Sequence, residues 1–356
     1  MNLGLNTPSA VPKKEEDDLK IRDLYHRPLC DLRVSVIDQC NFRCSYCMPQ
    51  DHCAEQYTFL KKDQWLTFPQ IERLVRMFAK LGVEKVRLTG GEPLLRPGLS
   101  TLIRKLKKIP GLKDLALTTN GSLLYRDARK LRKAGLNRIT VSLDTLDAEM
   151  FRQINGHRGT LERVLDGIRE CEDAGYECIK INVVLQKNIG HRRILDLVRY
   201  FKGRKPILRF IEYMDVGNCN HWNPAAVVPA SEIVDLINEH FPIEPVESNY
   251  YGEVASRYQF ADGEGEVGFI TSITQPFCRT CTRSRLSADG KMYTCLFANH
   301  GIDMRSFLDQ DVSDDELLNI IQSAWQKRDD RYSELRAKPA TPRKNLPKIE
   351  MFQIGG

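Results

Sequence analysis

The chain has 356 residues, of which 42% are hydrophobic and 28% charged, as is typical of an ordinary soluble protein. No run approaches 18 apolar residues, so the sequence predicts no transmembrane helix and no membrane partner. The net charge of +6 and the pI of about 8.7 suit an anionic ligand. They fall short of the pI above about 9 expected of a dedicated nucleic-acid binder.

The N-terminal residues 1–22 mix Pro and Ser with the charged run 13–18, and they are predicted to form a disordered arm. They contain neither an apolar signal core nor the acid-poor composition of a transit peptide. The chain has eleven cysteines, but their spacing is that of metal ligands and not of a short disulfide-rich protein. We therefore expect a reducing, cytoplasmic location.

Short apolar runs alternate with longer amphipathic stretches from residue 32 to residue 211. The runs predict strands at 32–37, 85–88, 114–118, 138–143, 179–184 and 207–211. The stretches predict helices at 69–81, 99–108, 124–133, 161–174 and 191–201, the first with a capping box of Thr67 and Gln70. This alternation favours an α/β fold with a parallel sheet. A partial, six-stranded TIM-like barrel is our first choice and an open doubly wound sheet the second.

Three cysteines, Cys40, Cys44 and Cys47, follow the first predicted strand in a C-x3-C-x2-C spacing. Soft thiolates select zinc, copper(I) or an iron–sulfur cluster. Three of them leave one metal position open to a second molecule. The alternative is a structural or zinc-binding cysteine group, which the spacing alone does not exclude.

Further polar or glycine residues end the following strands, where parallel α/β folds gather their ligands. Gly90 and Gly91 allow the main chain to approach a ligand closely, although a plain tight turn is the simpler explanation. Helix capping is the alternative for Thr118 and Ser142. Lys180 lies in an otherwise apolar strand and needs an anionic partner if it faces inward.

The pattern changes after about residue 215. A helix capped by Ser231 is predicted at 231–240, and short strands follow at 256–260 and 267–270. We expect a domain boundary near 245. The chain would then consist of the arm 1–22, a barrel domain 23–245 and a smaller C-terminal domain 246–356.

A second group of three cysteines, Cys278, Cys281 and Cys295, lies in the C-terminal part. A predicted hairpin, 285–287 and 291–294, would bring Cys295 back beside the other two. Spacing alone suits a zinc ribbon, with His300 or a carboxylate as fourth ligand, equally well. The absence of a later cysteine, together with Arg279, Arg283 and Arg285, favours a cluster with an open iron beside phosphates or a guanine edge.

From about residue 30 to its end, the chain resembles the GTP 3′,8-cyclase family of radical S-adenosylmethionine (SAM) enzymes, which act in molybdenum cofactor biosynthesis. The motifs that carry the resemblance are residues 32–35, 40–47, 87–96, 118–121, 141–144, Lys180, 210–214, 278–285, 295–297 and the terminal Gly355-Gly356. Thr282 and Ser284 depart from the family pattern, which weakens the case for Ser284 itself. The alternatives are a radical SAM peptide-modifying enzyme and a zinc-ribbon scaffold protein.

The resemblance implies two 4Fe-4S clusters, one on each cysteine group, and SAM as cofactor. The residues expected to contact SAM are Tyr46, Gly91, Ser142 and Met214, although Met214 would more simply be core packing. Those expected to bind GTP are Arg33, Arg87, Thr118, Lys180, Arg283, Ser284 and Arg285. The tail, Gly355-Gly356, is expected to reach the active site.

The implied reaction converts GTP to (8S)-3′,8-cyclo-7,8-dihydroguanosine 5′-triphosphate. A 5′-deoxyadenosyl radical removes hydrogen from ribose C3′, and C3′ then bonds to C8 of guanine. The implied partners are an electron donor such as a flavodoxin or ferredoxin, and a downstream cyclic pyranopterin monophosphate synthase. A monomer or homodimer is expected, without a nucleic-acid partner.

Overall fold

The computed structural model describes residues 20–50, 57–187, 193–336 and 348–355. Most of the predicted N-terminal arm, and Gly356 of the tail, lie outside the described residues. Within them, no helix combines the length and the apolar character needed to cross a membrane.

One mixed sheet of 12 strands organises the fold, in the order β12-β11-β10-β1-β2-β3-β4-β5-β6-β9-β8-β7. The six predicted strands form its parallel centre, with ends shifted by one or two residues. They are β1 (Asp31–Ser35), β2 (Lys85–Thr89), β3 (Asp114–Thr119), β4 (Arg138–Ser142), β5 (Cys178–Leu185) and β6 (Ile207–Glu212). Because β12 and β7 do not pair with each other, the sheet is an incomplete barrel.

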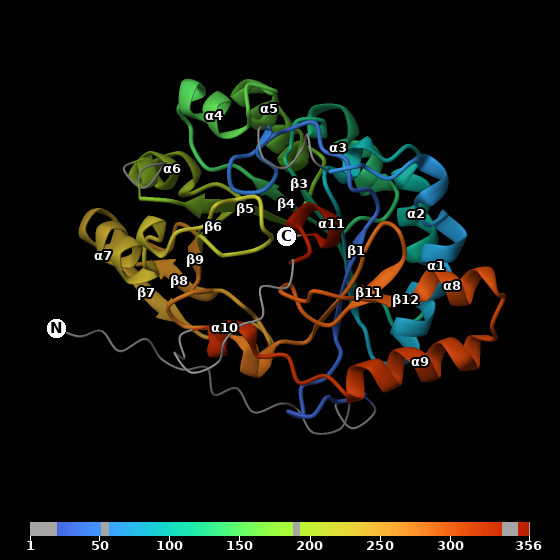
Figure 1. Cartoon of the computed structure of the whole chain (residues 1–356). Helices are drawn as coiled ribbons and strands as arrows, with labels where there is room; N and C mark the ends of the chain where they lie inside the picture. The colour runs from blue at the N-terminus through green and yellow to red at the C-terminus, as the bar shows by residue number, and fades with distance from the viewer. Residues whose placement is uncertain (1–19, 51–56, 188–192, 337–347, 356) are drawn as a thin grey trace.

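Helices cover the outer face of this sheet, and the strands curve around the short C-terminal helix α11 (Met351–Ile354), as Figure 1 shows. The outer helices are α1 (Phe68–Lys80), α2 (Leu99–Leu106), α3 (Leu124–Lys133), α4 (Ala148–Ile154), α5 (Leu161–Asp173), α6 (Ile194–Phe201) and α7 (Ala230–His240). Helices on one face favour the barrel over the doubly wound alternative. The core lies between helices and sheet, where side chains such as Leu74, Phe78 and Ile103 are fully buried.

The N-caps of the helices can be compared directly with the predicted ones. Thr67 and Gln70 form the predicted capping box at α1. The predicted cap of α7 is wrong, because Pro229 is the N-cap and Ser231 already lies inside the helix without a capping bond. Helix α4, which Asp147 caps, was not predicted.

The C-terminal part of the chain extends both edges of the sheet. Beside β6 lie β9 (Glu266–Ile270), β8 (Ser256–Phe260) and β7 (Ile243–Val246). Beside β1 lie β10 (Arg283–Leu286), β11 (Lys291–Tyr293) and β12 (Ile302–Asp303), so the predicted hairpin is present. Helices α8 (Met304–Asp309), α9 (Asp314–Gln326) and α10 (Tyr332–Leu335) follow. The division at 245 stays a prediction.

Candidate active site

The first cysteine loop begins just after β1 and folds back on itself. Cys47 donates from its backbone to the carbonyl of Cys44 over 3.0 Å, and the Cys40 sulfur accepts from the Phe42 amide at 3.4 Å. Burial raises the pKa of Cys40 to about 11 and of Cys47 to about 12. Burial also raises the pKa of Cys44, and the charges of Cys40 and Cys47 raise it further. The thiols therefore lie close enough for their charges to affect one another.

This donor set fits an iron–sulfur cluster. Buried thiols that repel one another as anions need a cationic partner before all three can ionise, and an iron cluster supplies it. Among the described residues, no group of three His, Cys, Asp or Glu side chains converges on a single ion. In a cubane each thiolate binds a different iron, so its ligands lie farther apart than those of one zinc ion.

Gly90 and Gly91 bring β2 against this loop. The Gly91 amide donates to Ile37 O over 2.8 Å, and the Glu92 amide donates to Gln39 O over 2.8 Å. Gly90 has φ +137°, and a Cβ atom at Gly90 or Gly91 would overlap the carbonyl oxygen of Ile37 or Gln39. The two glycines are thus required by contact with the cysteine loop itself, and not only by the approach of a ligand.

Glu92 ties the tips of β2 and β3 together. Its carboxylate accepts from the Thr119 hydroxyl at 2.7 Å, the Asn120 amide at 2.7 Å and the Leu94 amide at 3.0 Å. Burial raises the pKa of Glu92 to about 7, and these donors oppose the shift. The Asn120 side chain in turn donates to Asn41 of the cysteine loop over 2.9 Å.

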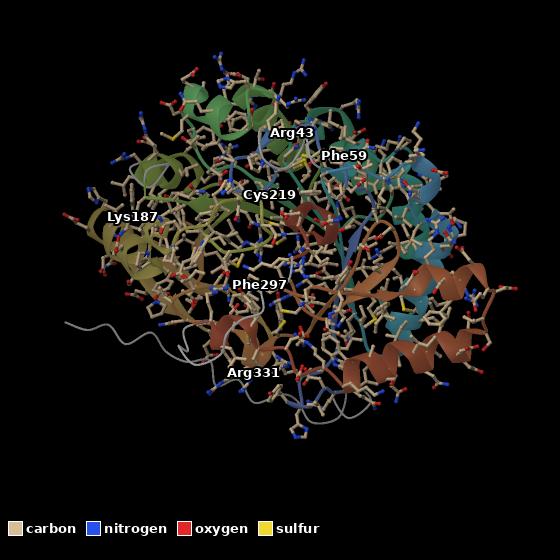
Figure 2. The ribbon with its side chains drawn as sticks, viewed as in Figure 1. Arg43, Phe59, Lys187, Cys219, Phe297 and Arg331 are labelled. Atoms are coloured by element: carbon tan, nitrogen blue, oxygen red, sulfur yellow. The ribbon has the colours of Figure 1, made fainter. Side chains whose placement is uncertain are left out.

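Arg43 binds the backbone of the cysteine loop. It donates to the carbonyl oxygens of Cys40 and Phe42, at 2.7 and 2.8 Å. Its guanidinium lies 5.7 Å from the ring centroid of Phe59 (Figure 2). The guanidinium therefore fixes the backbone of the loop and leaves the thiols free to bind a metal.

Three of the predicted SAM contacts lie in different settings, one in the loop and two after or at the ends of strands. Tyr46 donates to Asp144 at 2.8 Å, and Asp144 accepts from the Val184 amide at 2.8 Å, which links the loop to β4 and β5. Ser142 ends β4 and is half-buried. Met214 is also half-buried, and its carbonyl accepts from Asn220 over 3.4 Å.

A row of arginines crosses the inner face of the sheet. Arg285 of β10, Arg33 of β1 and Arg87 of β2 are register partners. Arg33 points away from the helices, because its neighbours on β1, Leu32 and Val34, are fully buried in the core beneath the helices. Its register partners Arg285 and Arg87 lie on the same face of the sheet. Burial lowers the pKa of Arg285 to about 10, and burial together with Arg285 and Arg87 lowers that of Arg33 strongly. Charges that repel one another in this way favour an anionic ligand.

A second row continues across the next strands. Thr118, Thr140 and Lys180 are register partners on β3, β4 and β5. Arg87 joins the two rows by donating to the hydroxyls of Thr118 and Thr140, both at 2.9 Å. Burial, followed by the charge of Arg209, lowers the pKa of Lys180 to about 8.

Arg209 and Lys85 belong to the same inner face, and neither was predicted. Arg209 of β6 donates to Asn182 of β5 over 2.7 Å, and its pKa falls to about 10 through burial and Arg87. Its signal was available, because Arg209 interrupts an apolar strand just as Lys180 does. Lys85 pairs with Asp31 over 3.3 Å.

The second cysteine group lies at the opposite end of the strands from the first, with the arginine row between them. Cys281 precedes β10, and Cys295 follows β11, which returns antiparallel to it. Although burial opposes it, the charges of Arg283 and Arg328 lower the pKa of Cys281 to about 6. Burial raises that of Cys295 to about 12, and the Cys281 charge adds to this. Two thiols whose charges interact, with guanidinium groups beside them, fit the binding of an anionic cluster.

Two predictions around this group need comment. Ser284 faces away from Arg283 and Arg285, because side chains alternate along β10, and its hydroxyl already donates to Tyr293 O at 3.1 Å. The alternation therefore separates Ser284 from the arginines. His300, the zinc alternative, is exposed, with Nδ1 2.6 Å from Asn299 Oδ1.

The C-terminal tail enters the barrel between the two cysteine groups. Arg285 donates to the carbonyls of Gly355 and, over 3.1 Å, of Ile354. Gly355 has φ +73°, and a Cβ atom there would overlap the Thr89 side chain. Phe352 of α11 packs against Met48 just after the cysteine loop. The tail thus contacts both the first cysteine loop and the arginine row.

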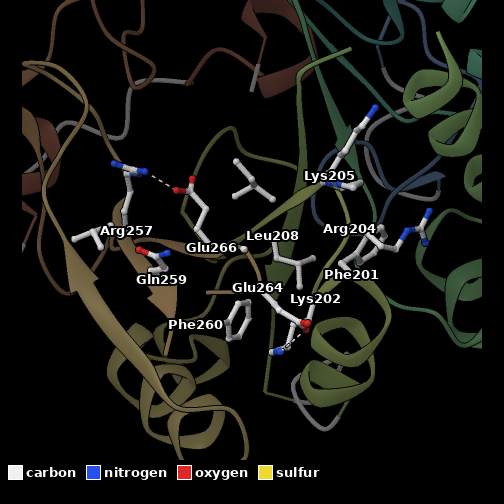
Figure 3. A pocket seen from close by; sticks show the side chains of 14 residues that line it. Phe201, Lys202, Arg204, Lys205, Leu208, Arg257, Gln259, Phe260, Glu264 and Glu266 are labelled. Carbon is white, nitrogen blue, oxygen red and sulfur yellow. Dashed lines mark hydrogen bonds and ion pairs between the residues drawn. The ribbon is translucent and has the colours of Figure 1, made fainter. Parts of the chain in front are cut away.

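Two cavities lie outside this inner face. One, of about 620 Å³, borders the cysteine loop at Asn41 and carries Arg152, Arg158 and Arg163. The other, of about 420 Å³, lies between α6 and the β6–β9 edge of the sheet (Figure 3). Two of its cations pair with carboxylates in the cavity wall, Lys202 with Glu264 and Arg257 with Glu266, and the cavity lies outside the inner face of the sheet. The second cavity is therefore not part of the candidate site.

Two family models match the chain: radical SAM superfamily over residues 34–201, and molybdenum cofactor synthesis C over 207–334. The crystal structure of Streptococcus suis SuiB bound to S-adenosylmethionine superposes with a TM-score of 0.57 at 17% sequence identity. The match covers 87% of this chain and 68% of that chain, and it shows a shared fold. The family model, together with the shared fold, identifies the chain as a radical SAM protein.

Relatives named GTP 3′,8-cyclase match nearly the whole chain. One from Xanthomonas campestris pv. campestris (strain B100) is 52% identical over 336 residues, or 94% of this chain and 97% of the relative. Another, from Staphylococcus haemolyticus (strain JCSC1435), is 47% identical over 338 residues, or 95% and 99%. The chain belongs to the GTP 3′,8-cyclase family.

Proposed function

We propose that the protein converts GTP to (8S)-3′,8-cyclo-7,8-dihydroguanosine 5′-triphosphate, the first step of molybdenum cofactor biosynthesis. One observation carries the assignment of the site: a row of inward cations spans the sheet between two groups of three cysteines. Since β1 and β10 are parallel and in register, the first group follows the row and the second precedes it. The nucleotide would then lie over the cation row, with one cysteine group beyond each end of the strands.

The first group, Cys40, Cys44 and Cys47, would hold a 4Fe-4S cluster with one iron open to SAM. Bound there, the cluster and SAM supply the 5′-deoxyadenosyl radical that removes hydrogen from C3′ of GTP. SAM would contact Tyr46, Gly91, Ser142 and Met214. Tyr46 is already oriented by Asp144, which supports its role in shaping the site.

The second group, Cys278, Cys281 and Cys295, would hold a second 4Fe-4S cluster whose open iron meets the guanine base. The triphosphate would lie along the cation rows, because no P-loop is present in the sequence and guanidinium groups bind phosphate with two donors each. The residues we assign to GTP are Arg33, Arg87, Thr118, Lys180, Arg209, Arg283 and Arg285. We leave Ser284 out, because its hydroxyl faces the other way.

The protein's own contribution is to position the reactants and to exclude water. Binding GTP between the two groups would bring ribose C3′ to the radical and hold C8 close to C3′ for bond formation. The tail ending in Gly355-Gly356 would close the chamber from the side of β1. The cations also keep the triphosphate from leaving while the radical exists.

Further proposals complete this assignment. The electrons would come from a flavodoxin or ferredoxin, and a cyclic pyranopterin monophosphate synthase would take the product onward. The protein would act in the cytoplasm as a monomer or homodimer. The region 246–356 would form the domain that carries the second cluster.

Anaerobic incubation with GTP, SAM and a reductant, followed by mass analysis of the nucleotide, tests the reaction. We expect a product that has the mass of GTP but a different chromatographic retention time, together with 5′-deoxyadenosine. Metal analysis tests the sites, since two cubanes bring about eight irons per chain. Stoichiometric zinc at the second group would contradict the two-cluster proposal.

A further inference from the structure

A buried arginine contacts the second cysteine group without belonging to the cation rows. Arg328 follows α9, and its side chain is 1% exposed. Its Nη2 lies 3.3 Å from the sulfur of Cys281, and its Nη1 donates to the Cys281 carbonyl over 2.8 Å. One guanidinium thus holds both the backbone and the thiol of a proposed cluster ligand.

Arg328 is itself fixed in place from several sides. Its Nη1 lies 3.4 Å from the carboxylate of Asp23, which is 0% exposed, and its Nε lies 3.3 Å from Asp330. The guanidinium stacks 4.5 Å from the ring of Trp325. Burying a charged pair costs desolvation energy, so the main effect of this contact is to fix the geometry of the guanidinium.

A second arginine supports the same group through the same carboxylate. Arg27 pairs with Asp23 over 2.6 Å and donates to the carbonyl of Cys278 over 2.7 Å. Asp23 therefore orients two guanidinium groups, one on each cysteine of the C-x2-C pair. This network joins the start of the described chain to its C-terminal part.

The first cysteine group has no equivalent contact among the described residues. The Cys40 sulfur accepts from the Phe42 amide at 3.4 Å and from the Asn120 side chain at 3.8 Å, and both donors are neutral. The nearby Arg43 donates to backbone carbonyls instead. The charge of Arg43 also acts on Cys40, but within the described parts of the chain only the second group has guanidinium groups within hydrogen-bond distance of a sulfur, Arg328 and Arg283 at 3.3 Å from Cys281.

We propose that Arg328 is a positioning residue for the second cluster, holding Cys281 and raising the reduction potential of that cluster above that of the first. The inference rests on the proposed second cluster. Reduction adds one electron, supplied by a low-potential electron-transfer protein, and makes the cluster more negative. Hydrogen bonds to sulfur and nearby positive charge stabilise that reduced state. A first electron entering the protein would then reside on the second cluster.

The test is a redox titration of the anaerobically reconstituted holoenzyme, followed by electron paramagnetic resonance. A Cys278→Ala variant identifies the signal of the second cluster by its loss. In Arg328→Met we expect the ratio of reduced to oxidised second cluster, at a fixed potential, to fall at least tenfold, equivalent to 59 mV for one electron. The first cluster should not shift. Arg328→Lys keeps the charge but loses the two-pronged guanidinium. Its ratio of reduced to oxidised second cluster should lie between those of the wild type and of Arg328→Met.

The matched control is Arg96→Met. Arg96 also stacks 4.5 Å from a tryptophan, Trp65, and donates to a backbone carbonyl, Leu66 O, over 2.8 Å, but it contacts no cysteine sulfur. It should leave both potentials unchanged. If Arg328→Met loses the second cluster altogether, the test is the potential of the second cluster in Arg328→Lys, which should lie below that of the wild type.

Two outcomes separate the inference from its premise. Unchanged second-cluster potentials in Arg328 variants that hold about eight irons overturn the role of Arg328 and leave the two-cluster proposal standing. About four irons in the wild-type protein, with a single paramagnetic signal, overturn the two-cluster proposal and the present inference with it.

Discussion

The guanidinium of Arg285 donates to the carbonyl oxygen of Ile354, 3.1 Å from Nη1, and so ties the arginine row to the C-terminal tail. The same side chain lies in register with Arg33, where we propose that the triphosphate binds. Arg285 therefore has two neighbours at once, and replacing it should affect both substrate binding and tail position.

Arg285→Ala should weaken GTP binding by about 10- to 100-fold, the effect of losing a charge-assisted hydrogen bond. SAM cleavage without GTP should continue, because the first cysteine loop is untouched. Binding measured by calorimetry, and deoxyadenosine measured by chromatography, check the two parts. Ser284→Ala is the control, since its hydroxyl faces Tyr293, and equal GTP affinity in the Arg285 variant and the wild type would refute the assignment.

The affinity for GTP should fall as the pH rises through about 8. Lys180 is protonated below its lowered pKa of about 8 and neutral above it, and a triphosphate favours the protonated form. Binding at higher pH must therefore take up a proton, which costs affinity. A Lys180→Arg variant should remove this decline. A wild-type profile without a decline up to pH 9 would count against Lys180.

Gly91→Ala should lower the iron content of the first cysteine group and SAM affinity. Its Cβ atom would overlap the Gln39 carbonyl and push β2 away from the cysteine loop. Gly268→Ala, on β9, is the control for iron content and SAM binding, because a Cβ atom there makes only ordinary contacts with Ala255 and Arg209. Iron analysis after reconstitution and SAM binding measure the effect, and full iron occupancy in the Gly91 variant would show that the overlap is relieved elsewhere.

Glu350→Ala should reduce product yield while leaving both clusters intact. Glu350 anchors the tail by accepting from the Asn218 backbone at 2.8 Å and from its side chain at 2.9 Å. Without this anchor, α11 loses its fixed place beside β1. Deleting Gly355-Gly356 should produce the same loss. Normal turnover by either protein would exclude a role for the tail, and the exposed Glu264→Ala serves as control.

Cys47→Ala should halve the iron content to about four per chain and abolish reductive SAM cleavage, because the first cluster loses one of three ligands. Cys171→Ala, at a free thiol in α5 outside both groups, should retain iron and activity. Iron quantification and deoxyadenosine formation distinguish the two variants. Deoxyadenosine formed by the Cys47 variant would disprove the assignment of the first group.

Much of the fold could be predicted because its signals are local. The six central strands alternate with amphipathic helices, and the hairpin that returns Cys295 is marked by Gly290 in its turn. Inward cations such as Lys180 stand out because a charge interrupts an apolar strand. Arg209 carries the same signal and was overlooked.

Other features depend on contacts between distant parts of the chain. The pairing of Asp31 with Arg283 joins strands about 250 residues apart, and no periodicity within either strand specifies it. The same holds for Arg328 beside Cys281, and for Gly91 against Gln39, where the backbone partner comes from another loop. Ser284 was predicted from its neighbours along the chain, and strand alternation turns it the other way.

The sheet order carries a practical consequence for dissecting the protein. Segments from the last third of the chain flank the central strands on both sides, β9 beside β6 and β10 beside β1. A fragment ending after β6 would expose two bare strand edges, each ready to pair with another molecule. The N-terminal two thirds should therefore aggregate when expressed alone, and co-expression of the missing piece should rescue its solubility.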